Sequence, residues 1–313
     1  MEKNVIPAYR RLNDSFSPEF VYHLGCEAGF FSEYNNMILG MLYCLRKRIR
    51  FSLYSSDANF AYLKGWTDYF IPFCEESGNI LHHWLNRRPN PRFKNRLLRG
   101  VDHCLSLAFR RISRNRLTLT DLWDEIRKQD LGSFEMPELG LTGDLRAACQ
   151  KLIQYTWRYN AETQRIVSDH IASLRLPMHY VGFHIRGGDK FVEARLQDVD
   201  VYIQKMCGLS SLREAFVLTD DYRIIELLER TYPDWTFYTL CAPEERGYFH
   251  QKFKKQSKEI IRAQHLRLFA SMDILASSEL FVGTFSSNPG MYLGMRMERD
   301  KTYSVDVPEW VIW

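Results

Sequence analysis

The sequence predicts an α/β protein built from two doubly wound halves that face each other across a cleft. Apolar, strand-like runs alternate with helix-like periodic segments twice along the chain, before residue 55 and again after Pro177. In each alternation a glycine-containing turn follows the first strand, which is where a parallel sheet presents its backbone to a ligand. With 313 residues, of which 45% are apolar, the chain is long enough for two domains of ordinary size.

The first half opens with a strand–helix–strand pattern. Phe20–Gly25 reads as a strand and Ser32–Lys47 as a helix, because its apolar residues recur at helical spacing; Ile49–Tyr54 is again a strand. This order predicts parallel strands with a ligand-facing edge. The aromatic-rich segment Gly65–Phe73 is expected to pack over that edge.

A mainly helical and basic insertion follows, from about residue 77 to 174. Within it, Leu131–Thr142 contains a proline and two glycines and is expected to be a loop. One helix is expected over Asp144–Leu174, and it must end before Pro177 because the residue before a proline disfavours helical geometry. We therefore divide the chain into domains 1–176 and 177–313.

The second half alternates strands and helices in the manner of a parallel nucleotide-binding sheet. The expected strands are Val181–Ile185, Ala215–Leu218, Trp235–Leu240 and Leu280–Gly283, and the expected helices are Val199–Met206, Tyr222–Arg230, Glu259–Ala276 and Asn288–Met297.

Cysteine usage and hydropathy bear on the compartment. The seven cysteines are scattered without a Cys-x-x-Cys pair, which argues against a disulfide framework and against a structural zinc site. The first residues lack the apolar core of a secretory signal. The longest apolar stretch, Met37–Leu45, is too short to span a bilayer. These features predict a cytoplasmic protein.

Positive charge is concentrated between Arg87 and Arg116, although the net charge is only +4. A solvated helix face would explain this stretch. Contact with an anionic partner, such as a membrane surface, a nucleic acid or an anionic glycan, would explain it too. Nucleic acid is the least expected of these, because no aromatic residues are interleaved for base stacking.

The segment His184-Ile-Arg186-Gly-Gly-Asp189-Lys190 ends a predicted strand in charged residues and a glycine turn. An arginine there offers a fixed, bidentate fork for a pyrophosphate, and a neighbouring histidine can donate to a phosphate or sugar oxygen. Glu193 would lie near the mouth of the same turn and could act as a general base. The alternatives are a structural salt bridge and an exposed glutamate at a helix start.

Polar residues also follow the strand 215–218. Thr219, Asp220 and Asp221 could bind ribose hydroxyls or a guanine edge. They could equally cap the helix that follows, which is the commoner use of such residues.

A third strand end carries Thr284-Phe-Ser286-Ser287, followed by Pro289 at the start of a helix. Backbone N–H groups and serine hydroxyls at a helix start can hold an anion, although no Walker loop is present. Ordinary capping is the alternative. Asp198-Val-Asp200 has the short Asp-x-Asp form that some transferases use to bind a metal, but here it opens a helix, and we expect no metal site.

Taken together, these segments resemble the α-1,6-fucosyltransferase superfamily, which includes the core fucosyltransferases of N-glycans and the nodulation fucosyltransferases. The matching motifs are Val181–Lys190, Thr219–Asp221 and Val282–Ser287. Weaker support comes from Tyr43-Cys44 after the N-terminal glycine turn and from Asn59–Tyr62. The three strand-end motifs fall in the last 140 or so residues, and the N-terminal half matches only in patches.

The resemblance implies a GT-B-like fold, with an acceptor-side N-terminal domain and a C-terminal domain that binds a nucleotide sugar. It also implies inverting, metal-independent transfer of L-fucose from GDP-fucose to a glycan hydroxyl, with no cofactor. Arg186 would neutralise the donor β-phosphate, Asp220 would recognise the nucleotide, and Tyr62 would close over the donor. Glu193 takes the place of the acceptor-side carboxylate, with a spacing one residue shorter than in the family.

On this basis the expected catalytic residues are Arg186, Asp189, Lys190 and Glu193, and the expected donor-binding residues are Tyr62, His184, Arg186, Thr219, Asp220, Asp221, Thr284, Ser286 and Ser287. Many relatives have a second arginine where this chain has Gly187. The alternatives are therefore a different GDP- or UDP-sugar donor and a non-catalytic protein that binds glycans or nucleotides with the same fold.

Overall fold

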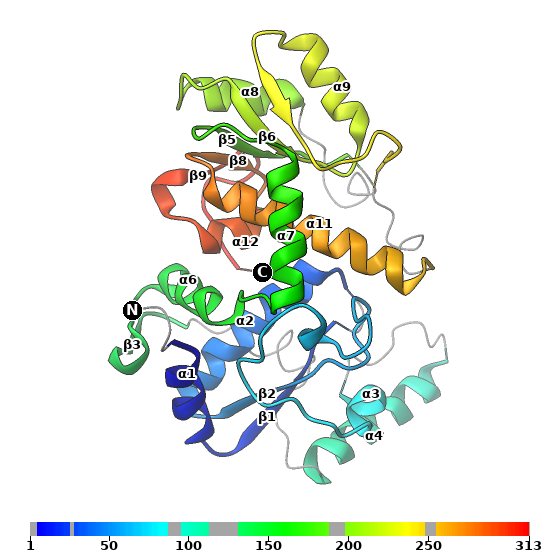
Figure 1. Cartoon of the computed structure of the whole chain (residues 1–313). Helices are drawn as coiled ribbons and strands as arrows, with labels where there is room; N and C mark the ends of the chain where they lie inside the picture. Colours follow the sequence, from blue (N-terminus) through cyan, green and yellow to red (C-terminus); the bar gives the residue numbers. More distant parts are fainter. Residues whose placement is uncertain are drawn as a thin grey trace. The chain divides into compact units, whose positions relative to one another are not determined.

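The structure is a computed structural model, and it describes residues 5–25, 28–86, 95–112, 131–187, 198–247 and 255–312. The chain separates into two compact units, which divide between Asn160 and Ala161 (Figure 1). We call them the N-terminal and the C-terminal unit.

The division lies one helix earlier than the 176/177 boundary expected from Pro177. Helix α7 (Ala161–Ser173) packs along α11 (Lys258–Ser277). The two are joined by an ion pair between Glu162 and Arg262, with 2.7 Å between the charged atoms. The long helix–helix contact therefore makes α7 part of the C-terminal unit.

The C-terminal unit is built on a five-stranded parallel sheet with the order β7-β6-β5-β8-β9. Its strands are β5 (Val181–His184), β6 (Glu214–Leu218), β7 (Thr236–Tyr238), β8 (Phe281–Gly283) and β9 (Thr302–Ser304). The chain moves outward from β5 to β7 and then returns to the other side of β5 for β8 and β9. This is the doubly wound order of dinucleotide-binding folds, with its switch point between β5 and β8.

Apolar residues on the strands and on two helices form the core of this unit. Phe183, Val217 and Val282 are fully buried in the sheet. The helices α8 (Val199–Cys207) and α9 (Tyr222–Thr231) cover it with residues at helical spacing. The remaining helix of the alternation, α12 (Asn288–Arg296), follows β8.

The N-terminal unit contains a smaller parallel pair. The strands β1 (Glu19–His23) and β2 (Arg50–Tyr54) pair in parallel and are connected by α2 (Phe30–Lys47), most of which is buried. Among the described residues of this unit, the parallel sheet therefore has two strands, with one further parallel bridge between Leu53 and Glu76. Helix α1 (Val5–Asp14) precedes β1 in the chain.

The aromatic segment 65–73 is part of the N-terminal core. Trp66, in the short 3-10 helix η2 (Trp66–Asp68), is fully buried and stacks on Phe70 with 4.3 Å between ring centroids. Phe70 in turn lies 5.1 Å from the ring of Trp157. An aromatic cluster of this size contributes much of the apolar burial of the unit.

Two expectations for the basic insertion are wrong. The single helix over 144–174 is two helices, α6 (Leu145–Thr156) and α7, because residues 157–160 leave helical geometry. There the Asn160 side chain donates to the carbonyl oxygens of Thr67 and Asp68, and the Arg158 carbonyl accepts from the Ile71 N–H. Tertiary contacts with the aromatic segment therefore override the helical periodicity.

The expected loop 131–142 contains an antiparallel hairpin, β3 (Phe134–Met136) and β4 (Leu141–Gly143), joined through the 3-10 helix η4 (Pro137–Leu139). Among the residues of the insertion that the structure describes before residue 131, two segments are helical as expected, α3 (Leu81–Leu85) and α4 (Arg96–Ile112). A last 3-10 helix, η6 (Arg299–Lys301), precedes β9. Among the described residues, no helix is both long and apolar enough to span a membrane.

Candidate functional site

The predicted strand-end motifs meet at the carboxyl edge of the C-terminal sheet. His184 is the last residue of β5, Thr219 follows β6, and Thr284 follows β8. His184 is buried, and its Nδ1 lies 3.4 Å from the hydroxyl of Ser287 beyond β8. The two strands on either side of the switch point are thus linked where a doubly wound sheet binds its ligand.

Arg186 lies in the turn that leaves β5 and is half-buried. The residues on either side of it are tied to β6 and to the turn beyond it: the Ile185 N–H donates to the Leu218 carbonyl at 3.0 Å, and the Gly187 N–H donates to Asp220 Oδ1 at 2.8 Å. The backbone around Arg186 is therefore held on both sides, which fixes the point from which its side chain extends.

Gly187 lies too close to Asp221 for a side chain. A Cβ atom added to Gly187 would lie 2.8 Å from the Cβ of Asp221 and 3.2 Å from Ile224 Cδ1. The second arginine of many relatives does not fit at this position in the present backbone arrangement. In this chain the space next to Arg186 is filled by the start of α9.

Asp221 is the N-cap of α9. Its Oδ1 accepts from the Arg223 N–H at 3.0 Å, and the Arg223 guanidinium pairs with both carboxylate oxygens. Hydrogen bonding from the Arg223 side chain lowers the pKa of this carboxyl. The Asp221 N–H donates to the hydroxyl of Thr219 at 3.2 Å. Asp221 therefore has the capping role that the sequence left open, whereas Asp220 binds the turn after β5.

Ser287 caps α12 and is fully buried. Its hydroxyl accepts from the Gly290 N–H at 3.2 Å and donates to the Thr284 carbonyl at 2.8 Å; the Thr284 hydroxyl lies 3.0 Å away. Ser286 and Thr284 are half-buried. The Ser287 hydroxyl is buried in the fold. Those of Thr284 and Ser286 lie nearer the surface, where Thr284 donates to Ser287 and Ser286 bonds to Asp306.

Asp306, beyond the end of β9, binds the same turn, and it was not among the residues predicted from the sequence. Its two carboxylate oxygens accept from the backbone N–H groups of Phe285 at 2.9 Å and Ser286 at 3.1 Å. Burial would raise the pKa of this carboxyl, but hydrogen bonds from Ser286, Ser304 and Phe285 outweigh burial and lower it. The N–H groups that we expected to hold a phosphate thus bind an internal carboxylate.

The strand-favouring residues of β9 are a weak hint at Asp306, because three residues are too few for a periodic pattern. Thr302–Ser304 is rich in residues that favour strands, and a carboxylate follows it at the same edge as the other motifs.

For four predicted residues the structure does not test the expected role. Asp189, Lys190 and Glu193 lie outside the described residues. Tyr62 belongs to the N-terminal unit, where it is half-buried and its N–H donates to Asp68 Oδ2 at 2.8 Å. Their roles stay predictions.

A second polar cluster lies at the carboxyl edge of the N-terminal strand pair, and its residues were not predicted from the sequence either. The Asp57 carboxylate lies 2.7 Å from His23 Nε2 and 2.5 Å from His83 Nδ1. His23 is buried, and its Nδ1 lies 2.6 Å from the Asn86 carbonyl oxygen. This arrangement fastens α3 to the ends of β1 and β2. The two histidines hold the pKa of Asp57 below its ordinary value, even though burial acts in the opposite direction.

The strand-end cluster of the C-terminal unit has two components of an anion site, the half-buried Arg186 and the buried His184. No group of three or more metal-ligating side chains occurs within the ranges that the structure describes.

Residues 148–290 match the family of α-(1,6)-fucosyltransferase N- and catalytic domains. The matched segment contains β5, β6, β8 and the strand-end residues after each of them. A comparison with curated protein sequences finds no match.

Among solved structures, the chain is similar to the fucosyltransferase NodZ from Bradyrhizobium, with a TM-score of 0.54 and 14% identity over 90% of this chain and 93% of that one. It is similarly close to NodZ α-1,6-fucosyltransferase soaked with GDP-fucose, with a TM-score of 0.53, 14% identity, and coverage of 90% and 93%. At this identity the likeness establishes the fold, which is GT-B-like.

Proposed function

Because residues 148–290 match the family of α-(1,6)-fucosyltransferase N- and catalytic domains, we propose that this chain is a glycosyltransferase that transfers L-fucose from GDP-fucose to a hydroxyl group of a glycan. The observation that carries the proposal is the position of Arg186. It follows the strand next to the switch point of a doubly wound sheet, in a turn fixed from both sides by hydrogen bonds.

The proposed chemistry is the displacement of GDP from the anomeric carbon. As the glycosidic bond breaks, negative charge grows on the β-phosphate, and a guanidinium that is already in place stabilises that charge most in the transition state. His184 at the same strand end could donate a hydrogen bond to a donor oxygen. The proton of the acceptor hydroxyl would pass to a carboxylate on the opposite side of the anomeric carbon, for which Glu193 is the candidate.

Attack from that opposite side inverts the anomeric configuration. In this scheme the leaving-group charge is balanced by Arg186 and by Lys190, without a metal or a cofactor. Asp220 and Thr219 would contact the nucleoside, and the half-buried hydroxyls of Thr284 and Ser286 would contact the diphosphate. Inversion, metal independence and these contacts are parts of the proposal.

The test is Arg186→Ala, with transfer measured from GDP-fucose to a panel of glycan acceptors. Loss of one preorganised charge donor is expected to lower turnover by about a hundredfold to a thousandfold. The matched control is Arg165→Ala, which removes an exposed arginine on α7 whose partner is Asp169 one helical turn away. Turnover in Arg186→Ala close to that of the wild type would refute the assigned role.

A second candidate function is the transfer of a different sugar, and Gly187 is the observation that favours it. This chain has one arginine where many relatives have two, so the charge at the donor differs. Thermal stabilisation by GDP-fucose, other GDP-sugars and UDP-sugars distinguishes the donors. Binding of a donor without transfer or hydrolysis would favour the non-catalytic alternative.

A further inference from the structure

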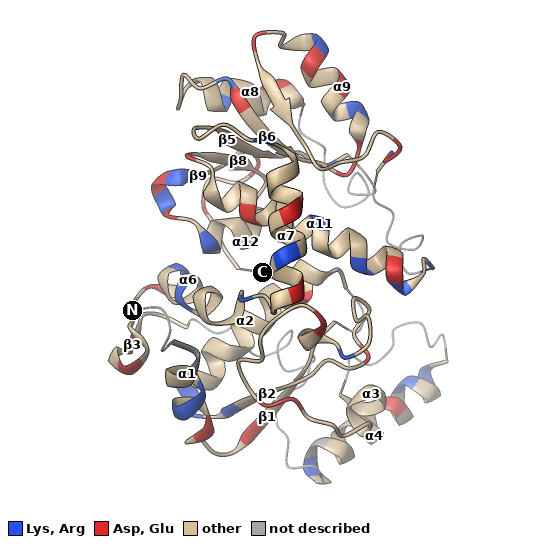
Figure 2. Ribbon diagram, in the orientation of Figure 1, with Lys and Arg blue, Asp and Glu red and all other residues tan. Residues whose placement is uncertain are grey.

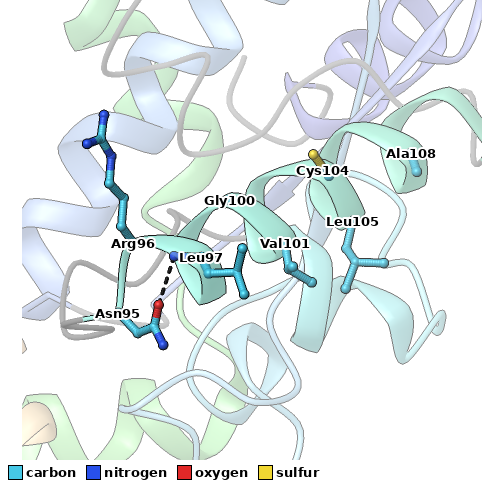
Figure 3. A pocket seen from close by; sticks show the side chains of 8 residues that line it. All are labelled: Asn95, Arg96, Leu97, Gly100, Val101, Cys104, Leu105 and Ala108. Carbon is cyan, nitrogen blue, oxygen red and sulfur yellow. Dashed lines mark hydrogen bonds between the residues drawn. The ribbon is translucent and has the colours of Figure 1, made fainter.

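Helix α4 exposes an apolar stripe along its length. Leu97, Val101 and Leu105 are 74%, 50% and 52% exposed. In Figure 3 they project from the same side of the helix, and Arg96 extends in another direction. With Cys104 and Ala108 they line an open groove of about 920 Å³ whose described lining residues belong to α4 and to Asn95 next to it.

A different face attaches α4 to the N-terminal unit. The Ser106 hydroxyl donates to the Leu85 carbonyl at 2.8 Å, and the buried Phe109 contacts the ring of His82 edge-on at 5.2 Å. An amphipathic helix of a globular protein normally turns its apolar stripe to the core. Here the stripe faces away from the attachment, and among the described residues it is available to a partner.

The charges of α4 indicate which partner. The helix carries Arg96 and Arg99 in its first turn and Arg111 in its last, all exposed, against one acidic residue, Asp102. Figure 2 shows positive charge at both ends of the helix. Apolar side chains flanked by arginines are typical of helices that lie in the surface of an anionic membrane.

Other partners fit less well. In a symmetric pair of α4 helices from two copies of the chain, the arginines at the helix ends would repel each other. A nucleic acid would satisfy the arginines but would leave the apolar stripe in water. The neighbouring helix α3 also exposes Trp84, by 57%, and tryptophan is enriched at membrane interfaces.

We propose that α4 docks this protein on an anionic phospholipid membrane, with the stripe of Leu97, Val101 and Leu105 among the acyl chains and the arginines at the headgroups. This inference does not rest on the proposed function, because membrane binding is measured without donor or acceptor.

The experiment is flotation of the full chain with vesicles of phosphatidylcholine alone and of equal parts phosphatidylcholine and phosphatidylglycerol. We expect binding to the anionic vesicles that weakens as salt is added. Replacing Leu97, Val101 and Leu105 together by glutamine is expected to lower binding about tenfold or more, because the stripe supplies the apolar insertion. Arg99→Gln is expected to lower binding to anionic vesicles about fivefold.

The replaced side chains are exposed, so the triple variant should keep the thermal stability of the wild type. Met178→Gln, at an 88% exposed position in the C-terminal unit, is the matched control and should bind as the wild type does. Equal binding to both kinds of vesicle, or unchanged binding of the triple variant, would overturn the proposal. So would a stable dimer that fails to bind vesicles and that the triple variant dissociates, since a second copy would then cover the stripe.

Discussion

Replacing Gly187 by alanine should destabilise the C-terminal unit and disturb the turn that carries Arg186. The new Cβ atom would lie 2.8 Å from the Cβ of Asp221, which is closer than two carbon atoms can pack. Asp221 cannot move away cheaply, because its carboxylate caps α9 and its N–H is bound by Thr219. The turn after β5 must therefore shift instead.

The cost can be estimated from similar overpacked sites. Forcing a methyl group into a filled position costs about 1–3 kcal/mol. In a unit of this size each kcal/mol lowers the melting temperature by about 2–4 °C. A shift of the turn also stretches the 2.8 Å hydrogen bond from the Gly187 N–H to Asp220, so Arg186 loses part of its fixed position. Turnover should then fall by more than the stability change alone explains.

Two measurements check this prediction: thermal unfolding followed by circular dichroism, and turnover with GDP-fucose well below the melting temperature. Gly208→Ala is the control, because the nearest atom to a Cβ there is 3.5 Å away, which is ordinary contact. If Gly187→Ala melts and turns over like Gly208→Ala, the close approach of the two turns is not a constraint and the reasoning is refuted. Gly187→Arg should lower stability and turnover at least as much as Gly187→Ala, although many relatives have an arginine at this position.

Two further predictions concern the half-buried Asp306 and the buried His265 of the C-terminal unit. Asp306→Asn leaves one of the two N–H groups of Phe285 and Ser286 facing an amide NH₂, so it should cost about 1–3 kcal/mol of unfolding free energy in a denaturant titration; an unchanged midpoint would contradict the bonding described. Burial lowers the pKa of His265 from 6.5 to about 4, so the folded state holds it neutral. Stability from this residue is therefore complete above pH 6.5 and is lost as the pH falls towards 4, by about 3 kcal/mol in total. In His265→Gln the unfolding free energy should fall less over that pH range, and equal pH dependence in the two proteins would exclude His265 as the cause.

Strand ends and long periodic segments of this fold can be predicted from the sequence. The apolar strand Val181–His184 and the helix Lys258–Ser277 lie close to their expected positions because burial alone determines them. By contrast, β9 has three residues, too few for a pattern, and Asp306 was missed with it. The break at 157–160 depends on hydrogen bonds from residues about ninety positions away, which helical periodicity does not contain.

The candidate site could also be predicted only in part. Rules for parallel sheets correctly bring His184, Thr219 and Thr284 to one edge. They do not separate a cap from a ligand, since both uses favour the same residue types at a helix start. In the structure, Asp221 and Ser287 serve as caps, and an internal carboxylate accepts hydrogen bonds from the backbone N–H groups of the turn after β8.

The sheet order also determines when this site can exist during folding. His184 and Ser287 lie side by side but are 103 residues apart in the sequence, and the intervening chain builds β6, β7 and α11 first. Closing so long a loop is slow compared with forming local helices. A nascent chain released before β8 would therefore expose the edge of β5 and would lack the part of the cluster that follows β8, so the proposed donor binding should appear only after β8 has been synthesised.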